Sequence, residues 1–226
     1  MPSDTQAIRD ETRSTAAWYG NDPDIAGAIR AASSDGYSLK RAFDLTAAII
    51  LLLVLAPLLP LIALAIRISS SGPVFVRQIR LGQYGKTFAY LKFRTMISTA
   101  PEIATGQSLA VKSDPRITAI GRFLRETSLD ELPALLNVVS GDMSIVGPRA
   151  ALPLELARYS RKQLRRLQLK PGITGYWQVY GRSNDGSDFA RMIRMDLLYV
   201  RRQSLLLDLK ILLRTAVVVL YRKGAY

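Results

Sequence analysis

The sequence predicts an α+β fold that is mainly helical: a bent membrane helix, then a domain with a small β-hairpin and amphipathic interfacial helices. Three observations predict this fold. Residues 45–66 carry no charge and contain two prolines. Two stretches rich in β-branched and aromatic residues, 74–81 and 86–96, flank a glycine-containing turn. The C-terminal half combines spaced apolar residues with many basic ones, which is typical of amphipathic helices.

The apolar run is the feature that divides the chain. Residues 1–36 are polar and predict a poorly ordered tail, with a short helix around 24–32. Residues 37–68 form the membrane segment, which ends before a stop signal of serines, a glycine and a proline at 69–73. Residues 69–226 form the domain that follows.

The membrane segment is unusual because of Pro57 and Pro60. About 20 apolar residues are enough to cross a bilayer as a helix, but a proline inside a helix removes a hydrogen bond and bends or breaks it. Positive residues favour the cytoplasmic side of a membrane, and here both ends of the run carry them. These observations favour a re-entrant helix that returns to the leaflet it entered, with a single kinked anchor as the alternative. The flanking cations are Lys40, Arg41, Arg67, Arg77 and Arg80.

Composition limits the chemistry. The chain has 31 Lys and Arg against 18 Asp and Glu, a net charge of +13, which suits an anionic membrane surface, nucleic acid or an anionic substrate. Without zinc-finger, basic-zipper or RNA-binding signatures, we expect no nucleic-acid partner. The chain has no Cys or His, so zinc sites built on them and a histidine base are excluded. Any metal would be a hard cation such as Mg²⁺ held by oxygen atoms.

The predicted hairpin pairs residues 74–81 with 86–96 across a turn at 82–85. In a regular second strand, Lys92 and Arg94 point to the same face. Two cations on one face suit a phosphate, although the spacing alone favours a solvated basic edge. Residues 97–113 are predicted to form a loop.

Helices are predicted along the rest of the chain, at 117–125 and 129–139 first. Residues 152–169 resemble a basic amphipathic helix in a membrane interface, or one packed on its own core. Residues 205–220 are too charged for a comfortable span, because they contain Asp208, Lys210 and Arg214. An interfacial or core helix fits better.

The most plausible site for chemistry is the acidic pair, Asp130 and Glu131. Ser128 and Glu131 match a capping box, and spacing alone favours that structural interpretation. In the functional interpretation, the pair lies at a helix N-terminus that favours anions. Asp130 attacks a phosphorus centre, and Glu131 holds Mg²⁺ against phosphates. Arg149 and the Lys92/Arg94 pair then act as cationic clamps. The two interpretations are compatible.

These residues belong to a longer set of motifs that covers roughly residues 40–220. The set is similar to that of the monotopic phosphoglycosyl transferases, the bacterial sugar transferases that begin exopolysaccharide and related glycan assembly. The motifs are Lys40-Arg41-x-x-Asp44, Gly72-Pro73-Val74-Phe75 with Arg77-Gln78, Lys92-Phe93-Arg94-Thr95-Met96, Asp114-Pro115-Arg116-Ile117-Thr118, Ser128-Leu129-Asp130-Glu131-Leu132-Pro133, Gly141-Asp142-Met143-Ser144, Val146-Gly147-Pro148-Arg149, Pro171-Gly172-Ile173-Thr174-Gly175, Gln178, Gly181-Arg182, and Asp196 before Tyr199-Val200.

The resemblance implies an enzyme on the inner, cytoplasmic membrane of a bacterium, with a re-entrant helix and a catalytic domain facing the cytoplasm. It implies that Asp130 is the nucleophile and Glu131 its Mg²⁺-binding partner, both close to the metal. Asp130 would attack the β-phosphate of a UDP-sugar, UMP would leave, and the phosphosugar would pass to polyprenyl (undecaprenyl) phosphate. Membrane lipids are then a further partner.

Other residues match positions that the family uses around its site. They are Lys92, Arg94 and Arg149 for substrate phosphates, Asp196 among the catalytic groups, and Gln178 and Arg182 for substrate. Residues 171–182 resemble a loop close to the nucleotide, with glycines that permit close backbone approach.

The chain departs from the family pattern twice. Ala150 replaces the usual proline after Arg149 and is expected to loosen that loop. Ala56 replaces the serine of the helix break, which changes the angle of the bend more than its presence. The sugar is not identified; a hexose such as glucose or galactose is expected, and an N-acetylated sugar stays open. The oligomeric state is open, a homo-oligomer included. The alternative function is a non-catalytic membrane-bound interaction module of the same fold.

Overall fold

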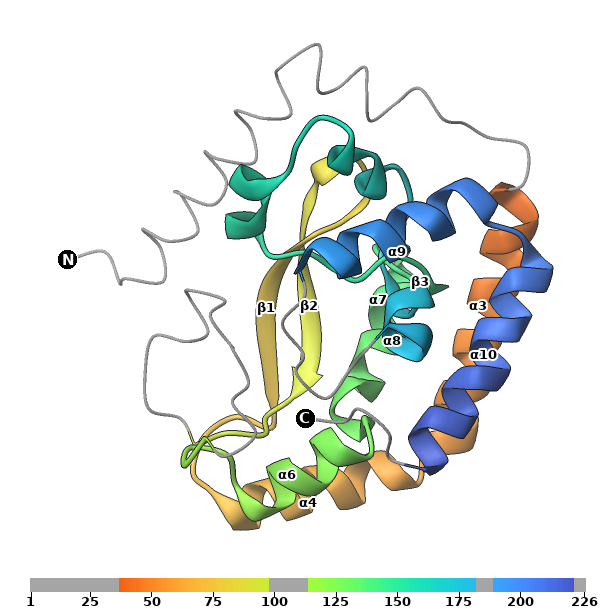
Figure 1. The fold of residues 1–226 in the computed structure, drawn as a ribbon. Coiled ribbons are helices and arrows are strands. Elements are labelled where there is room, and N and C mark those ends of the chain that lie inside the picture. The colour runs from red at the N-terminus through yellow and green to blue at the C-terminus, as the bar shows by residue number, and fades with distance from the viewer. Residues whose placement is uncertain (1–36, 98–113, 182–188, 222–226) are drawn as a thin grey trace.

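The computed structural model describes residues 37–97, 114–181 and 189–221 (Figure 1). The predicted tail with its short helix at 24–32, nearly all of the predicted loop at 97–113, and Arg182 lie outside these residues. The described part is mostly helical with two small two-stranded sheets, in agreement with the predicted α+β class.

The uncharged run forms two helices, α3 (Tyr37–Leu55) and α4 (Leu58–Ser69), bent by 64° where they meet. Pro57 is the N-cap residue of α4 and Pro60 lies in its first turn. Proline is tolerated there because the first N–H groups of a helix have no intrahelical partner. The predicted break is therefore confirmed at Pro57, whereas Pro60 continues the new helix. Within the described ranges, no single helix is long and apolar enough to cross a membrane; the bent pair reaches the required length and composition only when its two helices are taken together.

The N-terminal turns of α3 are attached to the rest of the domain by the charges that precede the apolar run. Lys40 Nζ donates to Asp208 at 2.7 Å and to the Val146 carbonyl at 3.0 Å. Arg41 donates to two carbonyls at the end of α7 (Leu135–Ser140). Asp44 accepts a hydrogen bond from the Ile145 amide at 3.1 Å. Lys40 and Arg41, which are the predicted positive flank of the membrane segment, thus also hold α3 against the domain.

The predicted hairpin is confirmed. Strand β1 (Phe75–Leu81) pairs antiparallel with β2 (Thr87–Phe93), and Lys92 lies opposite Val76. The turn contains the short 3₁₀ helix η1 (Gln83–Gly85). In Figure 1 the hairpin occupies the centre of the described fold.

A second sheet was not predicted. Strands β3 (Ser144–Val146) and β4 (Gly172–Thr174) are parallel, and each has only three residues. They approach so closely that a Cβ at Gly172 would lie 2.0 Å from the Gly147 nitrogen. Residues 171–181 thus form β4 and the short helix α8 (Tyr176–Tyr180) rather than a loop. Glycine is needed at position 172 because the backbone of Gly147 lies against it. The sequence analysis expected the glycines of this segment to allow close approach to a nucleotide.

The predicted helix at 152–169 is wrong. The structure has two 3₁₀ helices there, η3 (Pro153–Arg158) and η4 (Gln163–Gln168). The chain is extended at Tyr159 between them, and Arg166, expected on a polar face, has no exposed surface. By contrast, α10 (Leu205–Leu220) has the predicted bounds and turns Asp208 and Ile211 inward. It follows α9 (Phe189–Arg202).

The predicted helix at 117–125 is α6 (Ala119–Glu126), whose N-cap Thr118 accepts a hydrogen bond from the Gly121 amide. Helix α4 packs on the domain through Ile62 and Ile66, which join Phe93 of β2 and Leu124 of α6 in one apolar cluster. A larger cluster joins α3, the hairpin, α7, β3 and α10. The hairpin thus contacts both the bent helix pair and the segment that carries the acidic residues.

Candidate active site

The acidic pair lies on the 3₁₀ helix η2 (Leu129–Ala134), which runs directly into α7. The capping box predicted for this segment is wrong. Ser128 adopts the left-handed backbone conformation, with φ 57°, and its side chain makes no capping hydrogen bond, whereas N-cap residues are normally extended. The Glu131 amide donates to the Ser128 carbonyl at 3.3 Å. The pair is therefore not presented at the start of an α-helix, as the functional interpretation assumed.

Lys92 connects the hairpin to this pair. Its Nζ donates to Glu131 Oε1 at 2.7 Å and lies 3.6 Å from Asp130 Oδ2. One ammonium group thus serves two carboxylates. The structure places Lys92 beside the acidic pair and not on a solvated basic edge, which spacing alone favoured. Its predicted contact with a substrate phosphate stays a prediction.

The two carboxylates differ in their environments. Asp130 is buried, with 8% of its surface exposed, while 32% of the Glu131 side chain is exposed. Burial raises the pKa of Asp130, Lys92 opposes this effect, and the charge of Glu131 adds to it. A buried carboxylate is weakly solvated and therefore more reactive toward an electrophile than one in water.

Two cations, one from an arginine and one from a lysine, lie near the aromatic ring next to this pair. Tyr90, buried on β2, has the Arg80 guanidinium 5.9 Å and the Lys92 ammonium 5.3 Å from its ring centroid. Burial and the nearby charge of Arg149 lower the pKa of Arg80 to about 10. Arg80 and Arg149 are thus close enough to repel each other, and the region around Tyr90 is rich in positive charge.

Arg149 is held from two sides. Its Nη1 donates to Glu155 Oε1 at 2.9 Å, and its carbonyl accepts from Arg166 at 2.8 Å. Burial raises the pKa of Glu155, but Arg149, Tyr159 and Arg166 outweigh it, so the net shift is downward. Arg80 donates to the carbonyl of Ala150 at 2.8 Å. The segment expected to be loosened by Ala150 is therefore hydrogen-bonded on both sides of that residue.

Arg94 is not brought to the acidic pair. Strand β2 ends at Phe93, so the alternation of faces that relates Arg94 to Lys92 stops there. Arg94 instead donates to the carbonyls of Ser70 at 2.7 Å and Ile66 at 3.4 Å, at the end of α4. A cation at a helix C-terminus is favourable because the last carbonyls lack intrahelical donors.

Asp196 is also separate from the acidic pair in its contacts. It lies on α9 with no exposed surface and forms an ion pair with the fully buried Arg166. Arg166 also donates to the Tyr159 hydroxyl and to the Arg149 carbonyl. Asp196 was predicted among the catalytic groups, and that role stays a prediction. Its contacts connect it through Arg166 to the Arg149 carbonyl, an arrangement that favours a positioning role.

Gln178 lies on α8, which packs against α9 and α10. Its Oε1 is buried and has no hydrogen-bond partner in the part of the chain that the structure describes. The prediction that Gln178 and Arg182 bind substrate stays a prediction. The sequence analysis did not assign Arg80, Tyr90, Glu155 or Arg166 to the site. Only Arg80 had a local signal in the sequence: it is two residues from Gln78, so both polar side chains lie on the same face of the predicted strand.

The donor atoms of the acidic pair suit a hard cation only in part. Within the described ranges no group of three or more acidic residues is placed to hold a metal. Mg²⁺ is commonly bound by one or two carboxylates together with substrate phosphates. Asp130 and Glu131, which already share one cation in Lys92, fit that pattern.

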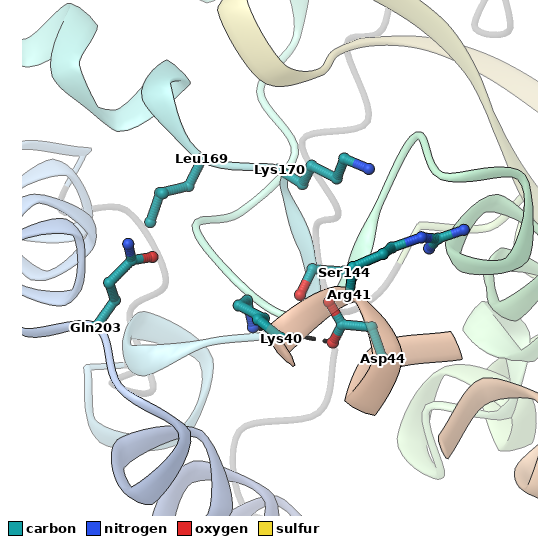
Figure 2. A pocket seen from close by; sticks show the side chains of 7 residues that line it. All are labelled: Lys40, Arg41, Asp44, Ser144, Leu169, Lys170 and Gln203. Atoms are coloured by element: carbon teal, nitrogen blue, oxygen red, sulfur yellow. Dashed lines mark ion pairs between the residues drawn. The ribbon is translucent and has the colours of Figure 1, made fainter. Parts of the chain in front are cut away.

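A small pocket lies elsewhere, beside the start of α3 (Figure 2). None of its lining residues belongs to the acidic pair or to the cations around Tyr90. The ion pair between Lys40 and Asp44 crosses it at 3.8 Å. The residues that line it are Lys40, Arg41, Asp44, Ser144, Leu169, Lys170 and Gln203.

Comparison with known proteins places this arrangement in a family. The profile described as bacterial sugar transferase matches residues 36–222. The chain belongs to the bacterial sugar transferase family. The match includes the bent pair, the hairpin, the acidic pair and Asp196, so all of the geometry described above lies inside the family region.

Relatives within the family differ in length. The chain is 38% identical over 217 residues to the exopolysaccharide production protein ExoY of Rhizobium meliloti, covering 90% of this chain and 94% of that protein. It is 42% identical over 202 residues to an undecaprenyl-phosphate galactose phosphotransferase of Salmonella typhimurium, covering 83% of this chain but 42% of that protein. It is 40% identical over 196 residues to an undecaprenyl-phosphate glucose phosphotransferase of Komagataeibacter xylinus, covering 83% of this chain and 37% of that protein. The chain thus spans less than half of the two named phosphotransferases.

Proposed function

We propose that this chain transfers a sugar-1-phosphate from a UDP-sugar to polyprenyl phosphate and releases UMP, as the first membrane step of exopolysaccharide or related glycan synthesis. The observation that carries the proposal is the buried carboxylate of Asp130, which shares the Lys92 ammonium with Glu131. Family membership and the phosphotransferase names of two relatives support it.

The reaction proceeds in two displacements at one phosphorus atom. A carboxylate oxygen of Asp130 attacks the β-phosphorus of the UDP-sugar, and the bond from that phosphorus to the bridging oxygen breaks, so UMP leaves. A phosphate oxygen of the polyprenyl acceptor then attacks the same phosphorus and frees Asp130. Lys92 orients the Asp130 carboxylate, and the positive charge around Arg80 and Arg149 favours a diphosphate at this place.

Mg²⁺ is the proposed cofactor, and Asp130 and Glu131 are the residues that would hold it. When bound, the ion neutralises negative charge on the phosphates. Lys92 would then move from Glu131 toward substrate, which its partly exposed side chain allows.

The proposed location is the cytoplasmic leaflet of the bacterial inner membrane, with the catalytic domain facing the cytoplasm and the bent pair inserted as a re-entrant helix. Its apolar side chains support this. On α3, Leu53 and Val54 are 70% and 66% exposed, and on α4, Leu61 and Ile68 are 64% and 78% exposed. Soluble monomers rarely expose contiguous apolar surface on this scale. A lipid acceptor carries its phosphate at the headgroup level, which a helix of this kind would place beside the domain.

The donor sugar is proposed to be a hexose, because the named relatives act on galactose and glucose. UDP-galactose and UDP-glucose are therefore the first donors to test. If the donor proves to carry an N-acetylated sugar, the proposed sugar is wrong but the proposed mechanism is unchanged.

The test is intact-mass spectrometry of the full chain in detergent, incubated with each donor and Mg²⁺ while the acceptor is withheld. We expect a mass increase of one phosphosugar and one equivalent of UMP. Asp130→Asn should abolish both. The matched control is Asp142→Asn, because Asp142 is an exposed acid of the same domain whose contact is with Ser140. If Asp130→Asn keeps full UMP release, the nucleophile is wrong. If wild-type protein gives no adduct with any donor, the non-catalytic module is favoured.

A further inference from the structure

Asn137 connects helix α7 to the strand that carries Lys92. Its side chain is buried, with 9% of the residue exposed. Its Oδ1 accepts a hydrogen bond from the Leu91 amide at 3.0 Å, and its Nδ2 donates to the Ala89 carbonyl at 2.9 Å. One side-chain amide therefore satisfies two backbone groups on β2.

These two backbone groups lie on the edge of β2 that faces away from β1. Within the described residues this sheet consists of β1 and β2, and no described strand pairs with the other edge of β2. Both hydrogen bonds are partly buried, and the primary amide of Asn137 takes the place of the peptide group of a third strand. The role needs a donor and an acceptor on one short side chain, which asparagine has and aspartate or alanine lacks.

The contact between Asn137 and β2 controls the geometry of the acidic pair, because both of the elements that it joins continue into the site. On the strand, Leu91 is followed directly by Lys92. On the other side, α7 continues without a gap from η2, which carries Asp130 and Glu131. The hairpin and the acidic segment therefore share two sets of polar contacts, the Asn137 amide and the Lys92 ion pairs. Apolar packing of Leu129 and Leu132 on the cluster of Phe93 adds to them.

We propose that Asn137 is a positioning residue that fixes the separation between the Lys92 ammonium and the Asp130 carboxylate. The proposal deepens the proposed function and rests on it where turnover is measured. Asn137 itself does not reach the carboxylates; it acts through β2. Without this attachment, the Lys92 side chain is no longer held at one distance from Asp130. It then occupies several positions, and the ion pair forms in only one of them.

The first measurement needs no substrate. Reductive methylation of the full chain, followed by peptide mass spectrometry, reports the reactivity of the Lys92 amine. Lys86, exposed on the same hairpin, is the internal reference. In Asn137→Ala we expect Lys92 to react about two- to fivefold faster relative to Lys86, the range that a partly exposed ion pair provides. Asn137→Asp, which keeps the shape but cannot donate to Ala89, should show the same direction and serves if the alanine variant does not fold.

The second measurement is the rate of phosphosugar adduct formation with UDP-galactose or UDP-glucose. Asn137→Ala should slow it by about 10- to 100-fold, as small displacements of catalytic groups do. In a Lys92→Met background the same change should cost less than about twofold, because residues that act through one contact are not additive. The matched control is Ser140→Ala on the same helix, which removes a hydrogen bond to the Asn137 carbonyl and should leave both measurements near wild type.

The outcomes separate the two proposals. Unchanged Lys92 labelling in both Asn137 variants would overturn the positioning role, whatever the activity. A loss of adduct that is equally large with and without Lys92 would also overturn it, because Asn137 would then act only on folding. Faster Lys92 labelling in a protein that forms no adduct with any donor would support the positioning role and remove the proposed function.

Discussion

The acidic pair with Lys92 and the pair of Arg166 with Asp196 each join an acidic residue to a cation, and they differ in their access to solvent. At the acidic pair, 24% of the Lys92 side chain and 32% of the Glu131 side chain are exposed. In the pair of Arg166 and Asp196, neither side chain is exposed at all. A partly exposed cation shared by two carboxylates can exchange its partner for a substrate phosphate. A fully buried pair cannot do so without local opening of its surroundings. Under the proposed function, the first cluster therefore carries the chemistry and the second stabilises the fold.

The largest expected effect comes from breaking the buried pair. Asp196→Asn removes the nearer counter-ion of the buried Arg166 and leaves the more distant Glu155, at 3.9 Å. Breaking a buried ion pair in this way costs up to about 3–5 kcal/mol of folding stability. Thermal unfolding followed by circular dichroism should show a strongly lowered midpoint. Asp142→Asn, at an exposed position, is the control and should melt like wild type. If Asp196→Asn instead melts normally and loses only adduct formation, Asp196 is a catalytic group and the comparison fails.

Removing the exposed cation should have the opposite pattern. Lys92→Met is expected to lower the rate of adduct formation about 10- to 100-fold and to change stability by less than about 1 kcal/mol. Burial raises the pKa of Asp130 and Lys92 opposes that rise, so the variant should raise this pKa further. The carboxylate is the reactive form, so the acid side of the pH–rate profile should move to higher pH.

Single-turnover UMP release across a pH series measures this shift. Lys86→Met is the control, because Lys86 is an exposed lysine on the same hairpin and should leave the profile in place. A profile that moves to lower pH in Lys92→Met would contradict the assigned electrostatics.

Neutralising Asp130 should have a smaller effect on folding stability than neutralising Asp196, and of the opposite sign. Because burial raises the folded-state pKa of Asp130 above its ordinary value of 3.8, its contribution to stability is full below that value and is lost as pH rises through the folded pKa. Asp130→Asn cannot ionise, so its folding stability does not fall in this way as the pH rises. We expect it to be more stable than wild type near neutral pH by about 0.5–2 kcal/mol.

The measurement is the thermal midpoint of both proteins from acid to neutral pH. The gap should narrow as the pH falls, since wild-type Asp130 becomes protonated. A variant that is less stable than wild type at neutral pH would show that the ion pair with Lys92 outweighs the cost of burying the carboxylate.

The contrast also explains which features could be predicted from sequence. The hairpin, the bend at Pro57 and helix α10 follow from local patterns, and each was predicted within a few residues of its bounds. The place of Lys92 beside the acidic pair followed from the family resemblance. These features depend on neighbours in the chain or on a motif.

Features that depend on distant partners were missed. Arg166 leaves the polar face of the helix predicted at 152–169 because Asp196, 30 residues away, pairs with it. The Asn137 amide matches an edge of β2 that lies 46 to 48 residues earlier in the chain. Strands of three residues, as in β3 and β4, are too short to leave a periodic signal. The capping box failed because a pattern of residue types does not report the backbone conformation at Ser128.

Ser128 offers the smallest and most local test of the comparison. It holds a left-handed backbone conformation two residues before Asp130, and such a conformation costs a residue with a side chain about 1 kcal/mol or more. Glycine adopts it freely, so Ser128→Gly should raise stability by up to about 1 kcal/mol. The matched control is Ser140→Gly in α7, where glycine in a helical conformation should lower stability by about 0.5–1 kcal/mol. Chemical denaturation of both variants measures the two signs. If Ser128→Gly is destabilising, the backbone at Ser128 is not strained, and the strain assigned to the turn before Asp130 is absent.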